Sequence, residues 1–174
     1  MTNKEIYIVV AVDENDGIGK NGKLPWSFKK EIAYFKNLTT TTNNPNNKNI
    51  VIMGRKTWES IDLKYRPLKN RINVILTKNK DFKAEGAKIS SSIEEALSFA
   101  DNQTEKIFII GGATLFNETI NLPGLTGIYL TRIESKYDCD TYFPTIPNRF
   151  SNKKELGSEE ENGIKYKFFL YSQT

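Results

Sequence analysis

The sequence contains no histidine and a single cysteine, Cys139. The lack of histidine excludes Ser-His and Cys-His nucleophilic systems, a histidine general base and most catalytic zinc sites. One cysteine can form neither an intramolecular disulfide nor a CxxC pair, and we interpret Cys139 as an unreactive strand or loop residue. Any catalysis must therefore use carboxylates, hydroxyls, lysines, backbone dipoles or a bound cofactor, and no metal site is expected.

Long apolar runs are also missing. No run approaches the roughly 20 residues of a membrane span, and the first five residues lack the apolar core of a signal peptide. The chain has 174 residues, of which 38% are hydrophobic and 26% charged, as is typical of a globular domain that needs no disulfide or metal. We expect a cytoplasmic protein in which residues 1–174 form one domain, with no membrane partner.

Positive charge is concentrated in one segment. Residues 55–80 include eight basic residues and two acids, a net charge of +6 in a chain whose total is +4. Some of this charge is ordinary solvated surface. Arg55, Lys56, Arg71 and Lys78, however, lie at the ends of apolar runs and favour an anionic small-molecule ligand. Nucleic acid is the weaker candidate, because these basic residues have no interleaved aromatics and an acidic run lies near the C-terminus.

Short apolar runs alternate with helical patterns along most of the chain. Strands are expected at residues 6–12, 50–53, 72–76, 107–110, 127–133, around Phe150 and at 164–171. Helices are expected after Ser27 as N-cap, and at 54–61, 92–100 and 113–120. This order predicts an α/β fold with a mostly parallel mixed sheet of about eight strands, an antiparallel C-terminal hairpin and about four flanking helices. Ligands bind such sheets at the carboxyl ends of the strands.

A glycine-rich motif after the first strand is misleading. Residues 17–22 read G-x-G-x-x-G, the dinucleotide fingerprint of Rossmann domains. In that fingerprint the glycines open a helix, whereas here Pro25 lies where the helix should run. The next strand also ends in Met53-Gly54-Arg55 and not in the acid that would bind the ribose. We therefore interpret residues 13–26 as a mobile loop over a site.

Three other strand ends combine glycines, hydroxyls and cations. They are Gly54-Arg55-Lys56-Thr57, Gly111-Gly112-Ala113-Thr114 and Thr77-Lys78. Glycines allow close backbone approach, and helix-start amides, hydroxyls and cations bind phosphate. Two such helix starts and a separate basic patch would suit a dinucleotide with an extra phosphate, which indicates NADP and not NAD.

Glu31 is the sole acid on the first expected helix, where it lies among apolar residues. Two interpretations remain open from the residues alone. Glu31 is either an exposed helix residue paired with Lys30 or Lys36, or a functional carboxylate.

The longer motifs carry a resemblance to a known family. Residues 16–26 (DGIGKNGKLPW) with 31–35 (EIAYF), and residues 51–61 (VIMGRKTWESI), are followed in order by RPL at 66–68, RIN at 71–73, IIGG at 109–112, YLT at 129–131 and DTYFP at 140–144. From Ile6 to about Tyr171 the chain resembles dihydrofolate reductase, of a eukaryotic, fungal-like monofunctional type. The resemblance implies a single-domain dihydrofolate-reductase-like fold and a monomer.

The implied activity is the NADPH-dependent reduction of 7,8-dihydrofolate to 5,6,7,8-tetrahydrofolate, an oxidoreductase reaction that serves one-carbon metabolism. Hydride passes to C6 while N5 gains a proton, through water admitted beside Leu24 and Trp26. Glu31 would bind the 2-amino group and N3 of the pterin, with the Thr131 hydroxyl as its partner, and burial would raise its pKa. Antifolate inhibitors would be further ligands.

The resemblance also implies the binding residues. The substrate would be held by Arg71 at the glutamyl α-carboxylate, and by Glu31, Thr131, Val9, Val10, Ile32, Phe35, Ile61, Leu68 and Ile110. The cofactor would contact Ala11, Ile18 and Gly19 at the nicotinamide, and Lys56, Thr57, Gly111, Gly112, Ala113, Thr114, Leu115 and Phe116 nearer the pyrophosphate. Arg55, Thr77 and Lys78 would bind the 2′-phosphate. Cis peptides are implied at Arg66–Pro67 and Gly111–Gly112, and Asp140 would contact the mobile loop.

Two positions depart from the family pattern. Phe116 stands where tyrosine is usual, which puts one polar contact near the nicotinamide in doubt. Asn70 replaces a glycine that is common in vertebrate relatives.

Three alternatives stay open. A pyrimidine reductase of the same fold would keep the NADPH half but would not need Glu31 and Arg71 together. A silent NADPH-binding protein would be favoured by loss of the carboxylate at position 31, which is present here. A nucleic-acid-binding module would require basic charge and aromatics on one face.

Overall fold

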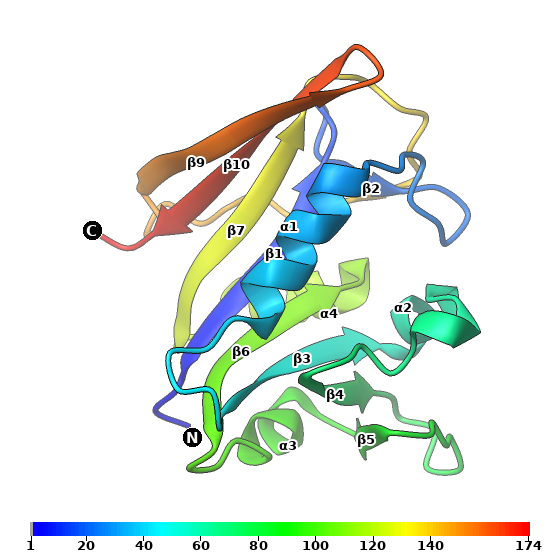
Figure 1. Ribbon diagram of the computed structural model, residues 1–174, viewed down its shortest axis with the longest axis vertical. Coiled ribbons are helices and arrows are strands. Elements are labelled where there is room, and N and C mark those ends of the chain that lie inside the picture. Colours follow the sequence, from blue (N-terminus) through cyan, green and yellow to red (C-terminus); the bar gives the residue numbers. More distant parts are fainter. Residues whose placement is uncertain (1) are drawn as a thin grey trace.

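The computed structural model describes residues 2–174 as a sheet with helices on both faces (Figure 1). The strands of the main sheet are β1 (Glu5–Val12), β3 (Lys48–Gly54), β4 (Arg71–Leu76), β5 (Ala87–Ser90), β6 (Thr104–Gly111), β7 (Leu125–Ile133), β9 (Asn152–Glu161) and β10 (Ile164–Ser172). Two short strands, β2 (Gly17–Gly19) and β8 (Thr141–Tyr142), pair separately. The helices are α1 (Lys29–Thr40), α2 (Arg55–Ser60), α3 (Ile93–Ser98) and α4 (Ala113–Thr119), with a 3₁₀ turn at Leu63–Tyr65.

The eight strands lie in the order β5-β4-β3-β6-β1-β7-β10-β9. The pairs from β5 to β7 are parallel, whereas β10 is antiparallel to both β7 and β9. This confirms the predicted mixed sheet with its antiparallel C-terminal hairpin. The parallel pairs place the carboxyl ends of β1, β3, β4 and β6 along one edge, where a ligand would bind.

Alternate residues of the buried strands pack on opposite faces. On one face, Ile6, Ile8 and Val10 belong to a core cluster with residues of α3 and α4. On the other face, Tyr7 and Val9 belong to a cluster with Trp58 of α2 and the half-buried apolar residues of α1. The molecule therefore has three layers, with α1 and α2 opposite α3 and α4.

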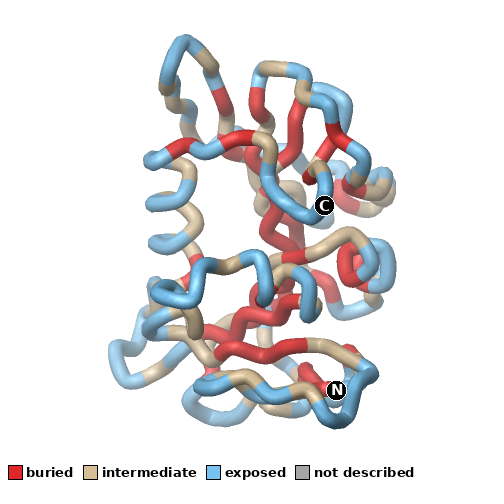
Figure 2. The backbone as a smooth tube through the Cα atoms, turned by 90° about the vertical axis from the view of Figure 1, so that its right-hand side faces the viewer, coloured by how far each residue is buried: buried red, intermediate tan, exposed pale blue. Residues whose placement is uncertain are grey.

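Helices α1 and α3 differ in how deeply their side chains are buried. In α3, Ile93, Ala96 and Leu97 are buried, and the Ser92 hydroxyl accepts the Glu95 N–H at 3.1 Å, as predicted for this N-cap. In α1 only Thr39 is buried. Figure 2 shows α1 as the column of pale-blue and tan turns beside the red strands. Its apolar side chains are therefore left with surface that a ligand could cover.

Some expected boundaries were wrong. Ser27 is not the N-cap of α1, because Phe28 occupies that position and no side chain of its own caps the helix. Phe150 lies in a buried turn, and the strand begins at Asn152. Strands β2 and β5 were not expected. Most of β9 was missed because its sequence, NKKELGSEEE, has almost no apolar residues, as is common for an edge strand.

Within residues 2–174, no helix combines the length and the apolar character that crossing a membrane requires.

Candidate active site

The three strand-end motifs come together at one edge of the sheet. Gly54 pairs with Leu76, so Arg55 and Thr77 begin their connections side by side. On the other side of β3, Met53 pairs with Gly111, which places the Gly111–Gly112 motif next to the start of α2. The structure thus brings together residues that are nearly 60 positions apart in the sequence.

The backbone of Gly111 and Gly112 lies close to the Thr57 hydroxyl. A Cβ atom at Gly112 would lie 3.3 Å from Thr57 Oγ1, and Gly111 has a φ of +133°, which favours glycine. The peptide between the two glycines is cis, as is Arg66–Pro67, and both were implied by the resemblance. The N-cap residues of α2 and α4 are the glycines Gly54 and Gly112, and neither helix has a side-chain cap. This leaves an open cradle of amides and a hydroxyl.

Cations surround this cradle. Lys56 and Lys78 are exposed, and neither has an ion-pair partner in the described part of the chain. Arg55 forms an ion pair with Glu59 at 3.6 Å and lies 5.9 Å over the Phe82 ring. These side chains are free to bind a phosphate at little cost, because exposed ion pairs are weak.

Glu31 occupies the first turn of α1 and is half-buried. Burial raises the pKa of its carboxyl to about 7, and the nearby Glu161 carboxylate adds to this effect. Within residues 2–174, Glu31 has no hydrogen-bond or ion-pair partner. Lys30 pairs instead with Glu159 at 3.0 Å. The alternative of an exposed Glu31 paired with its helix neighbour is therefore wrong.

The expected partner of Glu31 is not bonded to it. Thr131 is 3% exposed and pairs with Ala11 across β1 and β7, but no direct hydrogen bond joins it to Glu31 in the described chain. Thr131 lies on the sheet while Glu31 projects from a helix above it, so a bridging molecule would be needed to connect them. The nearby indole of Trp26 is also incomplete. Its Nε1 is buried and lacks a hydrogen-bond partner among residues 2–174.

Most, but not all, of the apolar residues expected to contact the substrate have side chains on the α1 face of the sheet. Val9, Phe35, Ile61, Leu68 and Ile110 all belong to the core cluster on the α1 face. Val10 points to the opposite face, so it could contribute to this side only through its backbone. Leu24 and Ile32 are exposed at the rim, at 60% and 56%.

Arg71 is half-buried and held in place by uncharged groups. Its Nε donates to the Lys69 carbonyl at 2.9 Å, and its Nη1 donates to the Thr39 hydroxyl at 3.0 Å. Burial lowers its pKa, and no carboxylate among residues 2–174 pairs with it. The preceding Asn70 has a φ of +62°, which asparagine tolerates well and which explains why it can replace glycine. The guanidinium is therefore oriented and available for an external anion.

The remaining expected cofactor residues are placed less uniformly. Ala11, Ile18, Gly112 and Ala113 are half-buried, Gly19 and Gly111 are buried, and Thr114 is exposed. The side chains of Leu115 and Phe116 are 3% exposed and belong to the core on the α3 side. Phe116 packs edge-on against Phe143, with ring centroids 5.2 Å apart. Any contact of Leu115 with a cofactor would therefore have to come from its backbone.

The expected mobile loop is tied to the segment before β8. The buried Asp13 carboxylate accepts N–H groups of Asn15, Gly17 and Tyr137 at 2.8–2.9 Å. Burial opposes its charge, but these three backbone donors lower its pKa overall. Asp140 accepts the Asn21 N–H at 3.0 Å, which confirms the expected contact. Cys139 is a buried loop residue packed on Gly17, as interpreted from the sequence.

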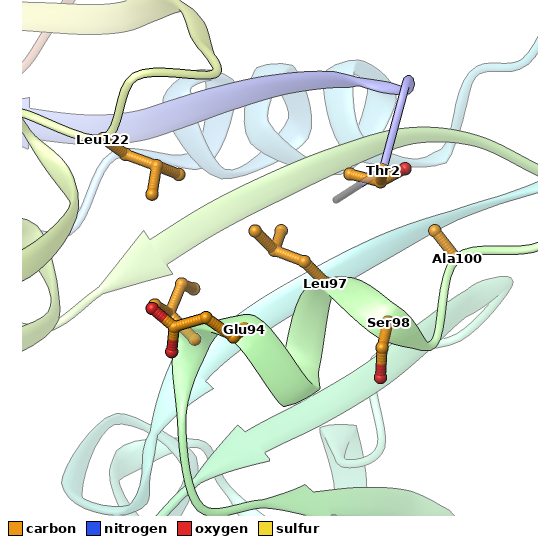
Figure 3. Close-up of a pocket in the computed structure, with 7 residues that line it drawn as sticks. Thr2, Glu94, Leu97, Ser98, Ala100 and Leu122 are labelled. Carbon is orange, nitrogen blue, oxygen red and sulfur yellow. The ribbon is translucent and has the colours of Figure 1, made fainter.

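A separate cavity of about 400 Å³ lies on the opposite face of the sheet (Figure 3). It is lined by Thr2, Ile93, Glu94, Leu97, Ser98, Ala100 and Leu122. None of the expected site residues lines it, so it is distinct from the candidate active site.

Two functional features were not found from the sequence. Asp13 organises the loop, and the Asp-x-Asn-Asp-Gly run at 13–17 is a turn signal that could have indicated it. Glu161 caps α1 from β9, and the following Asn162-Gly163 is a strong hairpin signal that could have located the strand end.

The fold and these groups define a protein of the α/β class, with a strand edge suited to phosphate and a half-buried, unpaired carboxylate. Comparisons with known proteins make the assignment specific. The family model described as dihydrofolate reductase matches residues 5–173. The dihydrofolate reductase of Heliothis virescens is 36% identical over 99% of this chain and 100% of its own length. The chain therefore belongs to the dihydrofolate reductase family.

Two further comparisons agree. The bifunctional dihydrofolate reductase-thymidylate synthase of Glycine max is 42% identical, but this chain spans only 33% of that relative. The solved structure of Schistosoma mansoni dihydrofolate reductase superimposes with a TM-score of 0.84 at 36% identity, covering 99% of this chain and all of that one. The relatives include plant and animal proteins, and the fungal-like subtype remains a prediction.

Proposed function

We propose that this chain reduces 7,8-dihydrofolate to 5,6,7,8-tetrahydrofolate with NADPH as hydride donor. The observation that carries the proposal is the Glu31 carboxyl, which is half-buried, unpaired within residues 2–174 and has a pKa of about 7. A carboxyl left without a partner at this position suits a ligand that supplies the missing donors. Family membership makes dihydrofolate the substrate to expect.

The donors of a pterin ring fit this carboxylate. Its 2-amino group and N3 present two parallel N–H groups, which a carboxylate can accept in a bidentate arrangement. Thr131 and the Trp26 indole, both on the α1 side of the sheet, would complete the polar end of the pocket. The half-buried apolar residues of α1 and of the facing strands would cover the rings.

The raised pKa of Glu31 suits the proton that must reach N5. With a pKa of about 7, both protonation states are populated near neutral pH, and the group can hold a proton without binding it too tightly. Glu31 fixes the ring, and a water beside Leu24 and Trp26 would deliver the proton. Because the fold contributes mainly orientation and electrostatics, catalysis rests on preorganisation.

Arg71 would bind the α-carboxylate of the glutamyl tail. Its Nε and Nη1 are occupied by the Lys69 carbonyl and the Thr39 hydroxyl, which fix the plane of the guanidinium. The remaining donors can meet a planar carboxylate. Arg71 is thus an unpaired, half-buried cation on the same face of the sheet as Glu31. A substrate with a ring at one end and a carboxylate at the other requires such a pair of groups.

The strand edge fits NADPH. A Cβ atom at Gly112 would make a tight 3.3 Å contact with Thr57 Oγ1, so glycine there keeps the backbone accessible to a pyrophosphate. Lys56 and Thr57 would hold the pyrophosphate, with Arg55, Thr77 and Lys78 at the 2′-phosphate. When bound, NADPH supplies the hydride. Ala11, Ile18 and Gly19 would bury the nicotinamide beneath the loop that Asp13 organises and exclude water.

We further propose a cytoplasmic monomer that also binds antifolate inhibitors. The support is the resemblance to the family. Sedimentation of the purified protein tests the monomer, and a concentration-dependent increase in mass would contradict it.

The proposed activity is tested by the loss of NADPH absorbance on adding dihydrofolate. NADH serves as the matched cofactor control, because it lacks the 2′-phosphate that the three residues at the β3 and β4 ends would bind. Turnover that prefers NADPH supports the proposal. Binding of NADPH without turnover of dihydrofolate would contradict it and favour a same-fold reductase for a pyrimidine substrate or a silent binding protein.

A further inference from the structure

The first turn of α1 has no cap of its own. Phe28 stands at the N-cap with φ −126° and ψ 120°, and its side chain cannot accept a hydrogen bond. Helix starts normally satisfy their unpaired N–H groups with a serine, threonine, aspartate or asparagine at this position. In α1 the acceptor must therefore come from elsewhere.

The acceptor is Glu161, the last residue of β9 and 130 positions away from Glu31 in the sequence. Its Oε1 accepts the Lys29 N–H at 3.0 Å and its Oε2 accepts the Lys30 N–H at 3.1 Å. One carboxylate thus binds the two N–H groups that immediately precede Glu31. The positive end of the helix dipole favours a negative charge at this place.

Glu161 is itself held on its other side. The Tyr166 hydroxyl, from β10, donates to Glu161 Oε2. Tyr166 is completely buried, and its ring packs against Phe28 with centroids 5.0 Å apart. The same tyrosine therefore contacts both the N-cap residue of α1 and the carboxylate that caps the helix.

A tight turn fixes where β9 ends. Glu161 pairs with Ile164, and the two residues between them, Asn162 and Gly163, have φ values of +53° and +78°. Positive φ at both central positions is the signature of a two-residue hairpin whose twist matches the strands. Glu161 is thus fixed by the hairpin on one side and by the Tyr166 hydroxyl on the other.

We propose that Glu161 is a positioning residue for Glu31: its carboxylate caps α1 from the C-terminal hairpin and so fixes the position of Glu31 in the first turn of that helix. The effect of Glu161 on catalysis depends on the proposed function, because Glu161 itself has no proposed contact with substrate or cofactor. It makes the C-terminal hairpin part of the active site, although the hairpin lies at the far edge of the sheet from the cofactor-binding strands.

Several ionisable groups share the surroundings of Glu31. From β9, the Glu161 carboxylate raises the pKa of Glu31. Glu159 on the same strand is neutralised by Lys30. Tyr34 on α1 and Tyr166 on β10 are the phenols near Glu31, and burial raises the pKa of both, so they stay neutral. Among these groups, Glu161 is the one whose charge raises the pKa of Glu31.

The charge of Glu161 persists over the working range of pH. The Tyr166 hydroxyl and then the Lys30 and Lys29 backbone N–H groups lower the pKa of Glu161. Glu161 is thus ionised when Glu31 titrates. Removal of the charge should make Glu31 easier to ionise, and loss of the cap should also loosen the turn that carries it.

The test is Glu161→Gln, which keeps the size of the side chain and removes its charge. Glu160→Gln is the matched control, since Glu160 is the adjacent exposed residue and loses the same charge. The carboxyl of Glu31 is titrated by carbon-13 NMR in the free protein and assigned with Glu31→Gln. We expect Glu161→Gln to lower the Glu31 midpoint by about one pH unit. Glu160→Gln should leave it unchanged.

Two further readouts separate positioning from a merely structural cap. Amide exchange at Lys29 and Lys30 should accelerate in Glu161→Gln and in Tyr166→Phe, which retains the charge but releases the carboxylate. The KM for dihydrofolate should rise roughly threefold to tenfold in Glu161→Gln, and the pH profile of turnover should shift with the Glu31 midpoint.

Coinciding Glu31 titrations in wild type, Glu161→Gln and Glu160→Gln would overturn the inference. So would unchanged exchange at Lys29 and Lys30 in both variants. These NMR readouts use no substrate, so they fail or succeed independently of the proposed reaction. An absence of wild-type turnover would contradict the proposed function and leave the structural part of the inference standing.

Discussion

Helices α1 and α3 cover opposite faces of the same sheet, but their first turns are built differently. The N-cap of α3 is local, because the Ser92 hydroxyl accepts the Glu95 N–H and the Glu95 carboxylate accepts the Ser91 N–H at 2.8 Å. The start of α1 has no local cap and depends on Glu161 from the end of β9. The helix that supports the core is thus capped by residues adjacent in sequence, whereas the helix that carries the candidate carboxylate needs the completed sheet.

The two helices also differ in what they bury. Three residues of α3 are buried against the sheet, whereas Glu31, Phe35 and Leu38 of α1 remain half-buried beside an unpartnered indole N–H. Complete packing stabilises a fold, and incomplete packing leaves groups whose partners a ligand must supply. The comparison therefore separates a stabilising layer from the proposed binding layer.

The strongest test of this separation replaces a glutamate by glutamine in the first turn of each helix. Glu31→Gln in α1 should lower kcat/KM for dihydrofolate by about 100-fold or more, because it removes the group that we propose orients the pterin and holds a proton. Glu94→Gln changes an exposed acid in the first turn of α3 and should leave kcat/KM within about twofold. Steady-state kinetics at neutral pH measures both. Equal effects of the two changes would contradict the distinction.

A pair of truncations tests the layers for stability. Leu97 of α3 is 3% exposed, and Leu97→Ala should lower the free energy of unfolding by about 2–5 kcal/mol with little change in the KM for dihydrofolate. Phe35→Ala, in the half-buried surface of α1, should raise that KM and cost less stability. Urea unfolding and initial-rate kinetics provide the two measurements. The reverse pattern would show that α1 is the stabilising helix.

The pH dependence of stability sharpens the contrast further. The pKa of Glu31 is about 7 in the folded protein against an ordinary value of 4.5, so between these values the folded state binds more protons than the unfolded state. Stability should therefore fall as pH rises from 4.5 to about 7. Glu31→Gln should be more stable than wild type by on the order of 1–3 kcal/mol at about pH 8, and equal to it at about pH 4.

Thermal unfolding at the two pH values measures this difference. A variant that is less stable than wild type at the higher pH would mean that the Glu31 carboxylate has hydrogen-bond partners within the folded protein. That result would contradict the proposal that a ligand supplies those partners.

The smallest effect concerns the local cap. Ser92→Ala should lower the free energy of unfolding by about 1 kcal/mol, because the Glu95 N–H loses its acceptor. Turnover and the pKa of Glu31 should not change. Urea unfolding gives the stability difference, and a loss of activity at unchanged stability would show that the two faces are coupled.

The sequence predicted those parts of the fold that local rules determine. Apolar runs located β1, β3, β4, β6, β7 and β10, and Ser92 located the start of α3. The order of strands and helices then predicted the parallel sheet and the edge where Arg55, Thr77 and Gly111 meet. Periodicity and topology are sufficient for such features.

The sequence failed where distant residues complete a local structure. Ser27 resembled an N-cap, but the actual acceptor lies in a charged edge strand whose polar sequence hides it. Two further features could not be predicted without the register of β1. They are the face of the sheet to which Val10 points and the absence of a direct hydrogen bond between Glu31 and Thr131. The identity of the carboxylate was indicated by the resemblance, whereas its pKa depends on burial and on Glu161.

The pH dependence of dihydrofolate reduction tests the central claim most directly. The rate of NADPH oxidation would be measured from about pH 5 to about pH 9 in wild type and in Glu31→Gln. We predict a wild-type rate that passes through a transition at about pH 7, where Glu31 titrates, and a low rate in Glu31→Gln without that transition. A wild-type rate that does not change across this range, or a variant that keeps the wild-type rate, would contradict the account.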